Sequence, residues 1–249
     1  MGNLRLMCVT AHPDDEAGGF GGSLLLYQSR GVETYIVCLT PGQAARNRGG
    51  HQADEDLAAA RRKEFAAACE ILKVTGGEVL DYPDAHLDRA DLYAVVGELA
   101  LRIRRIRPQV VITFGPEGAM TAHPDHSMAS IFATMAYHWA GRTNRYVEQL
   151  NNGLRPHRTQ KLYYTTSTFT LPDRQPVSPS PPTTVVNIAP YVETKIRAFK
   201  AHTTQAPLFP LFEKNVARRG HFEMFHLAAS IRPGPVEPEE DLFAGVVGD

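Results

Sequence analysis

Residues 4–16 read LRLMCVTAHPDDE, and this stretch decides the fold and the site that the sequence predicts. Its first part, residues 4–10, is an apolar run of strand length, typical of the middle of a parallel sheet. An imidazole and three carboxylates then follow within five residues, from His12 to Glu16. In open α/β sheets, ligands bind outside the carboxyl ends of the strands. We therefore expect a functional site at this turn.

The composition excludes several classes of protein. The 249 residues are 43% hydrophobic and 21% charged, as expected for a globular chain that buries its own core. A formal net charge of −1 argues against a nucleic-acid partner. We expect neither a membrane span, which needs roughly 18 apolar residues, nor a secretory signal. Three widely spaced cysteines (Cys8, Cys38 and Cys69) indicate buried thiols and a cytoplasmic location.

Strand and helix patterns alternate along the chain, which predicts an α/β protein with a mostly parallel sheet. We expect strands at 4–10, 33–40, 78–81, 109–114, 161–165 and 183–188, and helices from 23, 54–72, 88–107, 128–138 and 190–200. Residues 172–182 contain five prolines and should form an extended surface loop; whether it acts as a lid is open. A single domain is expected over 1–249: a core carrying the site (1–140), substrate-side elements (141–231) and a C-terminal arm (232–249).

A second polar cluster, residues 122–126 (AHPDH), follows the strand expected at 109–114. His12 and Asp15 lie three residues apart at a strand-to-helix turn, so both can face one point, and His126 holds the equivalent place in the second cluster. Two nitrogens and one oxygen, with water in the fourth place, match an open catalytic zinc site. Fe²⁺ and Co²⁺ accept the same ligand types and stay open as alternatives.

Three further residues of the two clusters can be given catalytic roles. Asp14 lies between two predicted ligands and is the candidate general base. His123 is expected to stabilise the oxyanion and protonate the leaving amine, with Asp125 holding an imidazole, that of His123, in position. The competing interpretation is that each His-Pro-Asp turn is a helix cap, since aspartate caps helices well.

Other charged residues suggest contacts to the substrate or to the fold. Arg46 and Arg48 follow the second strand and could bind an anionic part of the substrate, although solvated charge on a loop explains them equally well. His202 follows a predicted helix and could reach the rim of the pocket and contact the substrate, although a place in the packing of the fold is the alternative. Arg61 and Glu64 are three apart on a helix and are expected to pair.

The two motifs, AHPDDE at 11–16 and AHPDH at 122–126, resemble those of the LmbE-like (PIG-L) metal-dependent deacetylases. These proteins remove N-acetyl groups from N-acetylglucosamine-containing molecules. The GGFGGS continuation at 18–23 and the segment 195–205 are similar to the family as well. The sequence departs from the usual family pattern after the second strand, in TPGQ at 40–43, and before the second motif, at Ala122.

The resemblance implies a Rossmann-like three-layer sandwich with helices on both faces of the sheet. It also implies zinc on His12, Asp15 and His126, a base at Asp14 and an acid at His123, in agreement with the roles argued above. The expected substrate is a small amino sugar or its conjugate.

The leading hypothesis is a zinc amidase that acts on the N-acetyl group of an N-acetylglucosamine-type sugar. One alternative is a metal-binding protein without turnover, against which Asp14 argues, because a binding site has no use for a base there. Another is a metallohydrolase for a non-sugar amide or an ester. The walls of the pocket, from residues 43–54 and from the chain after 141, would decide between substrates. The sequence leaves a homo-oligomer open.

Overall fold

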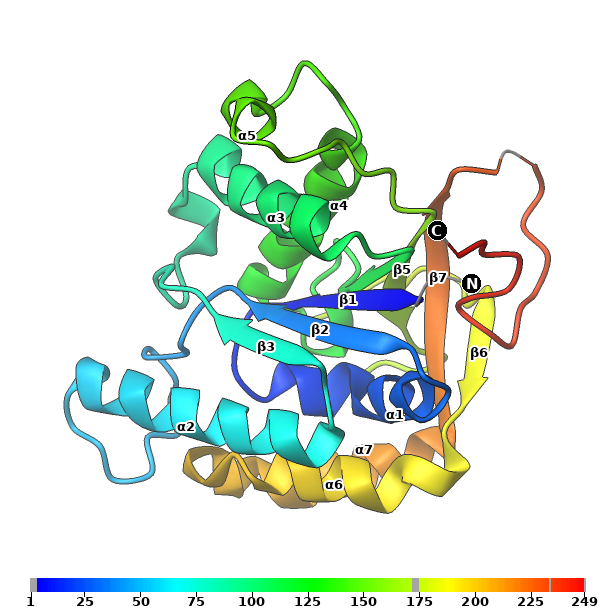
Figure 1. Cartoon of the computed structure of the whole chain (residues 1–249). Coiled ribbons are helices and arrows are strands. Elements are labelled where there is room, and N and C mark those ends of the chain that lie inside the picture. Colours follow the sequence, from blue (N-terminus) through cyan, green and yellow to red (C-terminus); the bar gives the residue numbers. More distant parts are fainter. Residues whose placement is uncertain (1–3, 172–174, 233, 249) are drawn as a thin grey trace.

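The computed structural model describes residues 4–171, 175–232 and 234–248 (Figure 1). In the described chain the strands are β1 (Arg5–Thr10), β2 (Glu33–Cys38), β3 (Gly76–Val79), β4 (Val110–Thr113), β5 (Lys161–Thr166), β6 (Thr184–Asn187) and β7 (Phe222–Ser230). They form one seven-stranded sheet in the order β3-β2-β1-β4-β5-β7-β6. Neighbours from β3 to β5 are parallel, whereas β7 runs antiparallel to both β5 and β6. The mostly parallel sheet predicted from the sequence is confirmed.

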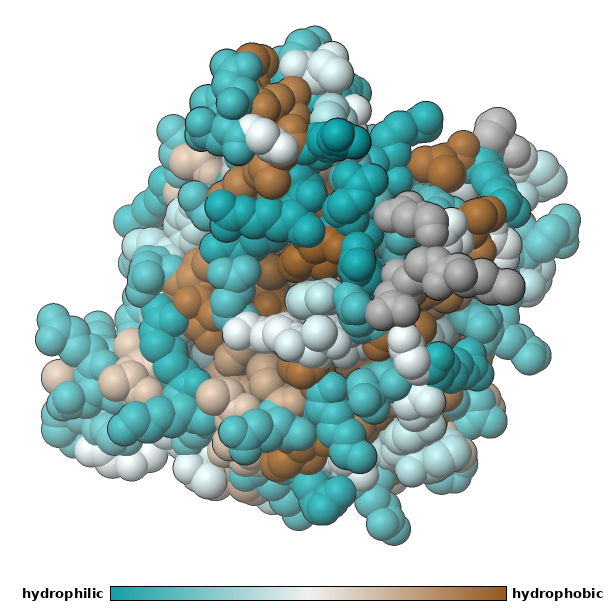
Figure 2. Space-filling model, in the orientation of Figure 1, coloured by the Kyte–Doolittle hydropathy of each residue, from teal (hydrophilic) through white to brown (hydrophobic). Residues whose placement is uncertain are grey.

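The helices cover both faces of this sheet. They are α1 (Asp15–Ser29), α2 (Asp54–Leu72), α3 (Leu92–Ile106), α4 (Pro124–Ala140), α5 (Val147–Asn151), α6 (Val192–Lys200) and α7 (Phe209–Arg219). Figure 1 shows α1, α2, α6 and α7 on one side of the sheet and α3 and α4 on the other, so the predicted three layers are present. Figure 2 shows hydrophilic side chains over the outer surfaces of α2 and α3, while hydrophobic residues gather toward the middle of the visible face.

The site lies beside β1, where the order in which successive strands are added to the sheet reverses. β1 lies in the centre with β2 on one side and β4 on the other, and its residues Leu6, Met7 and Cys8 are fully buried. The chain winds from β1 outward to β3 and then returns across β1 to β4. Loops that leave the carboxyl ends of β1 and β4 therefore diverge and leave a crevice, which is where ligands bind in such folds.

Helix α1 starts earlier than the sequence predicted, at Asp15, and runs through the glycines of residues 18–22. Glycine is needed there because neighbouring chain packs directly on the helix backbone. A Cβ atom at Gly22 would lie 2.4 Å from Cδ1 of Ile188. Close packing therefore accounts for Gly22, whereas a Cβ atom at Gly19 would meet nothing within 4 Å.

The last third of the chain contains two elements that the sequence analysis did not predict, α7 and β7. In the tail, Leu242 is fully buried and the hydroxyl of Tyr27 donates to Asp241 at 2.9 Å, so this segment lies against α1. Part of the expected proline-rich loop, residues 172–174, lies outside the described residues; 175–182 is irregular. Within the described ranges, no helix has the length and apolarity to cross a bilayer.

Candidate metal and catalytic site

The turn between β1 and α1 is held by the carboxylate of Asp15. Its Oδ2 accepts hydrogen bonds from the backbone N–H groups of His12, at 2.8 Å, and Ala11, at 3.2 Å. Asp14 adopts a φ of 114°, a conformation that side-chain-bearing residues rarely adopt, and its carboxylate makes no capping hydrogen bond to α1. Strained backbone of this kind is concentrated at functional sites. The helix-cap interpretation therefore does not account for Asp14.

His12 is 8% exposed and lies among three carboxylates. Its Nε2 is 3.0 Å from Oδ1 of Asp84 and 3.2 Å from Oδ2 of Asp125, and its Nδ1 is 3.4 Å from Oδ2 of Asp15. Burial alone would lower the pKa of His12, but hydrogen bonds to Asp125, Asp15 and Asp84 raise it well above the usual value. A carboxylate that holds one imidazole nitrogen leaves the other free to bind a metal. Nδ1 is thus the atom available to an ion.

His126 faces the same carboxylate from the second cluster. Its Nε2 is 3.1 Å from Oδ1 of Asp15, and its ring stacks on Phe114 with centroids 4.0 Å apart. Thr121 fixes the other nitrogen, since its hydroxyl lies 3.3 Å from Nδ1. Burial opposes ionisation of Asp15, yet the attraction of His126 and His12 brings its pKa well below the usual range.

The donor atoms fit a divalent transition metal. Two ligands of a tetrahedral zinc ion with bonds of about 2.0–2.1 Å are separated by about 3.3 Å. Oδ1 of Asp15 lies 3.1 Å from Nε2 of His126, and its other oxygen, Oδ2, lies 3.4 Å from Nδ1 of His12, so each carboxylate oxygen is close to that separation from one imidazole. The chain also brings nitrogens of His12, His123 and His126 within 4.8 Å of one another, and likewise donor atoms of His12, Asp84 and Asp125.

His12 belongs to both groups of potential ligands. The hydrogen bonds of Asp84 and Asp125 indicate that these two carboxylates do not belong to the ligand set. Asp125 is already occupied, because it accepts the backbone N–H groups of Ala85, at 2.7 Å, and Leu87, at 3.2 Å. Asp84 likewise accepts the N–H of Ala44 at 2.8 Å. Both oxygens of Asp125 are thus used by backbone donors, and Oδ1 of Asp84 faces Nε2 of His12, so these two carboxylates orient His12. In Asp15 the two backbone donors share Oδ2, and Oδ1 faces His126.

Asp14 lies beside the predicted ligands, with its carboxylate turned toward Arg61. The Nη2 atom of Arg61 is 3.0 Å from Oδ2 of Asp14, and the same guanidinium donates to the carbonyl oxygens of Pro13 and Gly42. Burial raises the pKa of Asp14 to about 6, against the opposing effect of Arg61. A carboxylate with a pKa near the working pH is well suited to accept and return a proton.

His123 precedes α4 and faces the rings of His12 and His126, with centroids 4.7 Å and 5.0 Å away. Burial and these two imidazoles lower the pKa of His123 to about 4. Its Nδ1 accepts the backbone N–H of Asp125 at 3.2 Å, so the neutral ring carries its hydrogen on Nε2. His123 is therefore a neutral hydrogen-bond donor at pH 7.

Three expectations about partners are corrected. The carboxylate of Asp125 holds His12, whereas the sequence analysis expected it to hold His123. Arg61 binds Asp14, while Glu64 accepts the hydroxyls of Thr203 and Thr204, each at 2.7 Å; the expected pair on α2 is replaced by these longer-range contacts.

The third correction concerns His202, which does not reach the pocket rim. Its side chain is 0% exposed, and Nε2 lies 2.7 Å from Oε1 of Glu16. Glu16 in turn accepts the backbone N–H of Asp14 at 3.0 Å. His202 thus positions Glu16, which binds the backbone of the strained turn at Asp14. The side chain of His202 does not line the pocket.

The two candidate substrate arginines lie on the loop after β2. Arg46 is exposed. Arg48 donates to backbone carbonyls of its own loop, including that of His51 at 3.0 Å, and pairs with Asp54 at 2.8 Å. These contacts give Arg48 a role in shaping the loop; substrate binding by either arginine stays a prediction.

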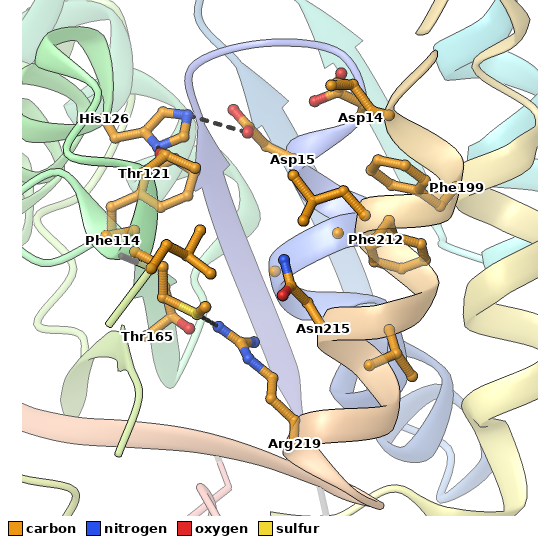
Figure 3. Close-up of a pocket in the computed structure, with 18 of the residues that line it drawn as sticks. Asp14, Asp15, Phe114, Thr121, His126, Thr165, Phe199, Phe212, Asn215 and Arg219 are labelled. Atoms are coloured by element: carbon orange, nitrogen blue, oxygen red, sulfur yellow. Dashed lines mark hydrogen bonds and ion pairs between the residues drawn. The ribbon is translucent and has the colours of Figure 1, made fainter. Parts of the chain in front are cut away.

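A pocket of about 220 Å³ opens beside Asp14, Asp15 and His126. Its far wall comes from α6, α7 and the 3₁₀ helix Thr203–Leu208 between them, through side chains such as Phe199 and Phe212 (Figure 3). This wall comes from the chain after residue 141, as the sequence analysis expected, whereas residues 43–54, all of them described, do not line the pocket. The sequence analysis did not predict α7, and it missed Asp84. The signal for Asp84 was its place shortly after β3, at the same sheet edge as the other polar clusters.

Comparison with known proteins adds independent findings. The family model described as PIG-L, GlcNAc-PI de-N-acetylase, matches residues 7–137, more than half of the chain. The mycothiol S-conjugate amidase of Streptomyces coelicolor is 30% identical over 98% of this chain and 97% of its own. The diacetylchitobiose deacetylase of Thermococcus kodakarensis is 30% identical over 82% of this chain and 70% of its own. A conserved protein of Thermus thermophilus has a similar structure, with a TM-score of 0.73, 28% identity, and coverage of 93% and 98% of the two chains.

Proposed function

We propose that this chain, which belongs to the PIG-L family of GlcNAc-PI de-N-acetylases, hydrolyses the N-acetyl amide of an N-acetylglucosamine-containing conjugate. Two relatives similar over nearly its full length are named a mycothiol S-conjugate amidase and a 1D-myo-inositol 2-acetamido-2-deoxy-α-D-glucopyranoside deacetylase. The observation that carries the proposal is the convergence of His12, Asp15 and His126 beside a base and a pocket.

His12, Asp15 and His126 would hold the metal, with Asp84 and Asp125 orienting His12. A zinc ion held there would supply a water whose pKa is lowered to about 7 and would polarise the amide carbonyl. Fe²⁺ or Co²⁺ would suit the same N and O atoms. The excess of buried carboxylates over cations around His12 supports a bound dication, because buried negative charge requires compensation.

The remaining chemistry falls to Asp14 and His123. Asp14 takes a proton from the attacking water, and its carboxyl group, with a pKa of about 6, can pass that proton to the leaving amine. His123 directs its Nε2 hydrogen to the oxyanion. Since the pKa of His123 is about 4, its neutral ring suits hydrogen bonding better than full proton transfer. This refines the expectation that His123 protonates the amine.

The test is metal analysis of the purified protein together with an amine-release assay over N-acetylated sugars and their conjugates. We expect about one divalent ion per chain and release of free amine. Asp14→Asn should keep the ion and lose turnover by about 100-fold or more, as is typical for loss of a general base. The matched control is Asp81→Asn, which changes an exposed carboxylate on the surface.

Each rival has its own outcome in this assay. Full metal occupancy without amine release from any amide would indicate a binding protein. Turnover confined to non-sugar amides or esters would place the chain with other metallohydrolases. Wild-type turnover by Asp14→Asn would remove the base from the mechanism.

A further inference from the structure

One cation in the pocket has no role in the proposed chemistry. Figure 3 shows the metal-site end, marked by Asp15 and His126, and Arg219 at the opposite end of the pocket. Arg219 is the last residue of α7, and its side chain points back into the space between α7 and the segment after β4. There its guanidinium contacts the sulfur of Met120, which is only a weak acceptor.

In the described part of the chain, no carboxylate forms an ion pair with Arg219. Glu223 is the acidic group that acts on it, but that carboxylate is already used. Lys195 lies 2.5 Å from its Oε1, and the backbone N–H groups of Gly22 and Ser23 donate to it at 2.9 Å and 2.8 Å. Glu223 therefore neutralises Lys195, and the positive charge of Arg219 has no carboxylate paired with it among the described residues.

The surroundings of Arg219 make this leftover charge costly. Side chains such as Leu211, Phe212 and Val216 line the pocket toward the metal end. Burial lowers the pKa of the Arg219 guanidinium, and Glu223 compensates only in part. Arginine stays protonated in proteins and offers a planar fork that matches carboxylate and phosphate groups. A partly buried guanidinium without a counter-ion at the end of a pocket is complementary to an anionic ligand group.

We propose that Arg219 binds an anionic group of the substrate, a carboxylate or phosphate separated from the scissile amide by an apolar portion that fills the pocket. This inference rests on the proposed function and adds the substrate class to it. The anion could belong to the group attached to the sugar or to the acyl group. Both share one chemistry, and the experiment separates them.

The test compares phenyl glycosides of N-acetylglucosamine with and without a para-carboxylate. The wild-type, metal-loaded enzyme should prefer the carboxyphenyl compound in kcat/KM by about tenfold or more, the range of a charge-assisted hydrogen bond. Arg219→Gln should abolish this ratio, and Arg219→Lys should retain part of it. The matched control is Arg218→Gln, because Arg218 is exposed on the same helix and stacks on Phe169, 4.0 Å from the ring centroid.

A second pair of substrates, phenyl glycosides of N-succinyl- and N-butyryl-glucosamine, places the charge on the acyl side. An Arg219-dependent preference in this pair alone assigns the anion to the acyl group. Equal ratios in wild type and Arg219→Gln for both pairs would overturn the proposal. Calorimetric binding of carboxyphenyl and phenyl glucosaminide, the deacetylated products, separates the two levels of inference. Binding that depends on Arg219 without any turnover would contradict the deacetylase function while supporting the anion site. Binding without preference, together with no Arg219-dependent preference in the acyl pair, would refute the site.

Discussion

Replacing Arg61 by methionine should destabilise the protein strongly, and the loss should depend on pH. The side chain is 3% exposed, and it pairs with Asp14 at 3.0 Å while donating to the carbonyl oxygens of Pro13 and Gly42. Methionine fills similar space but donates no hydrogen bond. Removing one partner of a buried ion pair costs about 3–5 kcal/mol, because the other charge stays buried without compensation.

This loss of stability has two parts: the broken ion pair, which depends on the ionisation of Asp14, and the lost hydrogen bonds to the two carbonyl oxygens, which do not. In the wild type the pKa of Asp14 is about 6, and removing Arg61, which lowers that pKa, raises it further in the variant. At pH 8 the variant must either bury an unpaired carboxylate or keep it protonated, so the loss from the pair should grow as pH rises above 6, toward the limit of about 3–5 kcal/mol for a broken buried pair. At pH 5 the carboxyl is mostly protonated, so the unpaired charge disappears. The two carbonyl oxygens remain without a donor at either pH, which costs about 1–3 kcal/mol for each of them. The double variant Arg61→Met/Asp14→Asn should recover most of the difference at pH 8.

The assay is urea unfolding followed by circular dichroism in EDTA, so that metal binding does not contribute to the free energy. Arg62→Met is the matched control: Arg62 also donates to two backbone carbonyls, those of Val79 and Leu80, but its ion pair is with Asp81, which is 95% exposed. Surface pairs of this kind contribute about 0–1 kcal/mol. Equal losses for Arg61→Met and Arg62→Met, or a loss for Arg61→Met that is unchanged between pH 5 and pH 8, would refute the reasoning.

Two further predictions concern the histidines. His126→Ala should abolish metal binding in elemental analysis, whereas His86→Ala, which changes an exposed histidine, should leave it intact; full occupancy in His126→Ala would break the proposed ligand set. The second is a pH dependence of stability. Burial lowers the pKa of His202, but Glu16 outweighs this and raises it above 6.5. The folded state therefore favours the charged ring, and this stabilisation is complete below pH 6.5, the ordinary value, and is lost as pH rises through the raised pKa. Unfolding of His202→Gln between pH 5 and 9 should lack this decline, while the exposed-site control His221→Gln keeps it; parallel curves for wild type and His202→Gln would contradict the assignment.

The elements that the sequence predicts well are those with strong local patterns. β1 and β4 are short apolar runs, and each is followed by a polar cluster. Both strands and the turns after them could therefore be predicted from the local order of apolar and polar residues. The convergence of His126 and Asp15 followed from one physical rule, that parallel strands place their carboxyl ends at the same edge. This rule needs no knowledge of which helices cover the sheet.

The predictions that were wrong concern residues whose partners are distant in the sequence, so no local pattern indicates them. Arg61 and Glu64 have the spacing of a helical pair, but the fold brings Asp14 to the first and Thr204 to the second. A local pair on an exposed helix contributes only about 0.2–0.5 kcal/mol, whereas a buried guanidinium must satisfy its charge. Tertiary contacts therefore decide such residues.

The substrate end of the site was hidden for a related reason. Phe209, Phe212 and Val216 have the spacing of an ordinary amphipathic helix, and nothing in that pattern distinguishes a helix that lines a pocket from one that packs on the core. Only the position of α7 opposite the segment after β4 makes its inner face a binding wall. Under the proposed function, the reaction depends on residues of two short motifs at the sheet edge, whereas the choice of substrate would depend on how the last third of the chain packs against them. Arg219 is the residue of this chain at which an anionic group of the substrate should make a measurable difference.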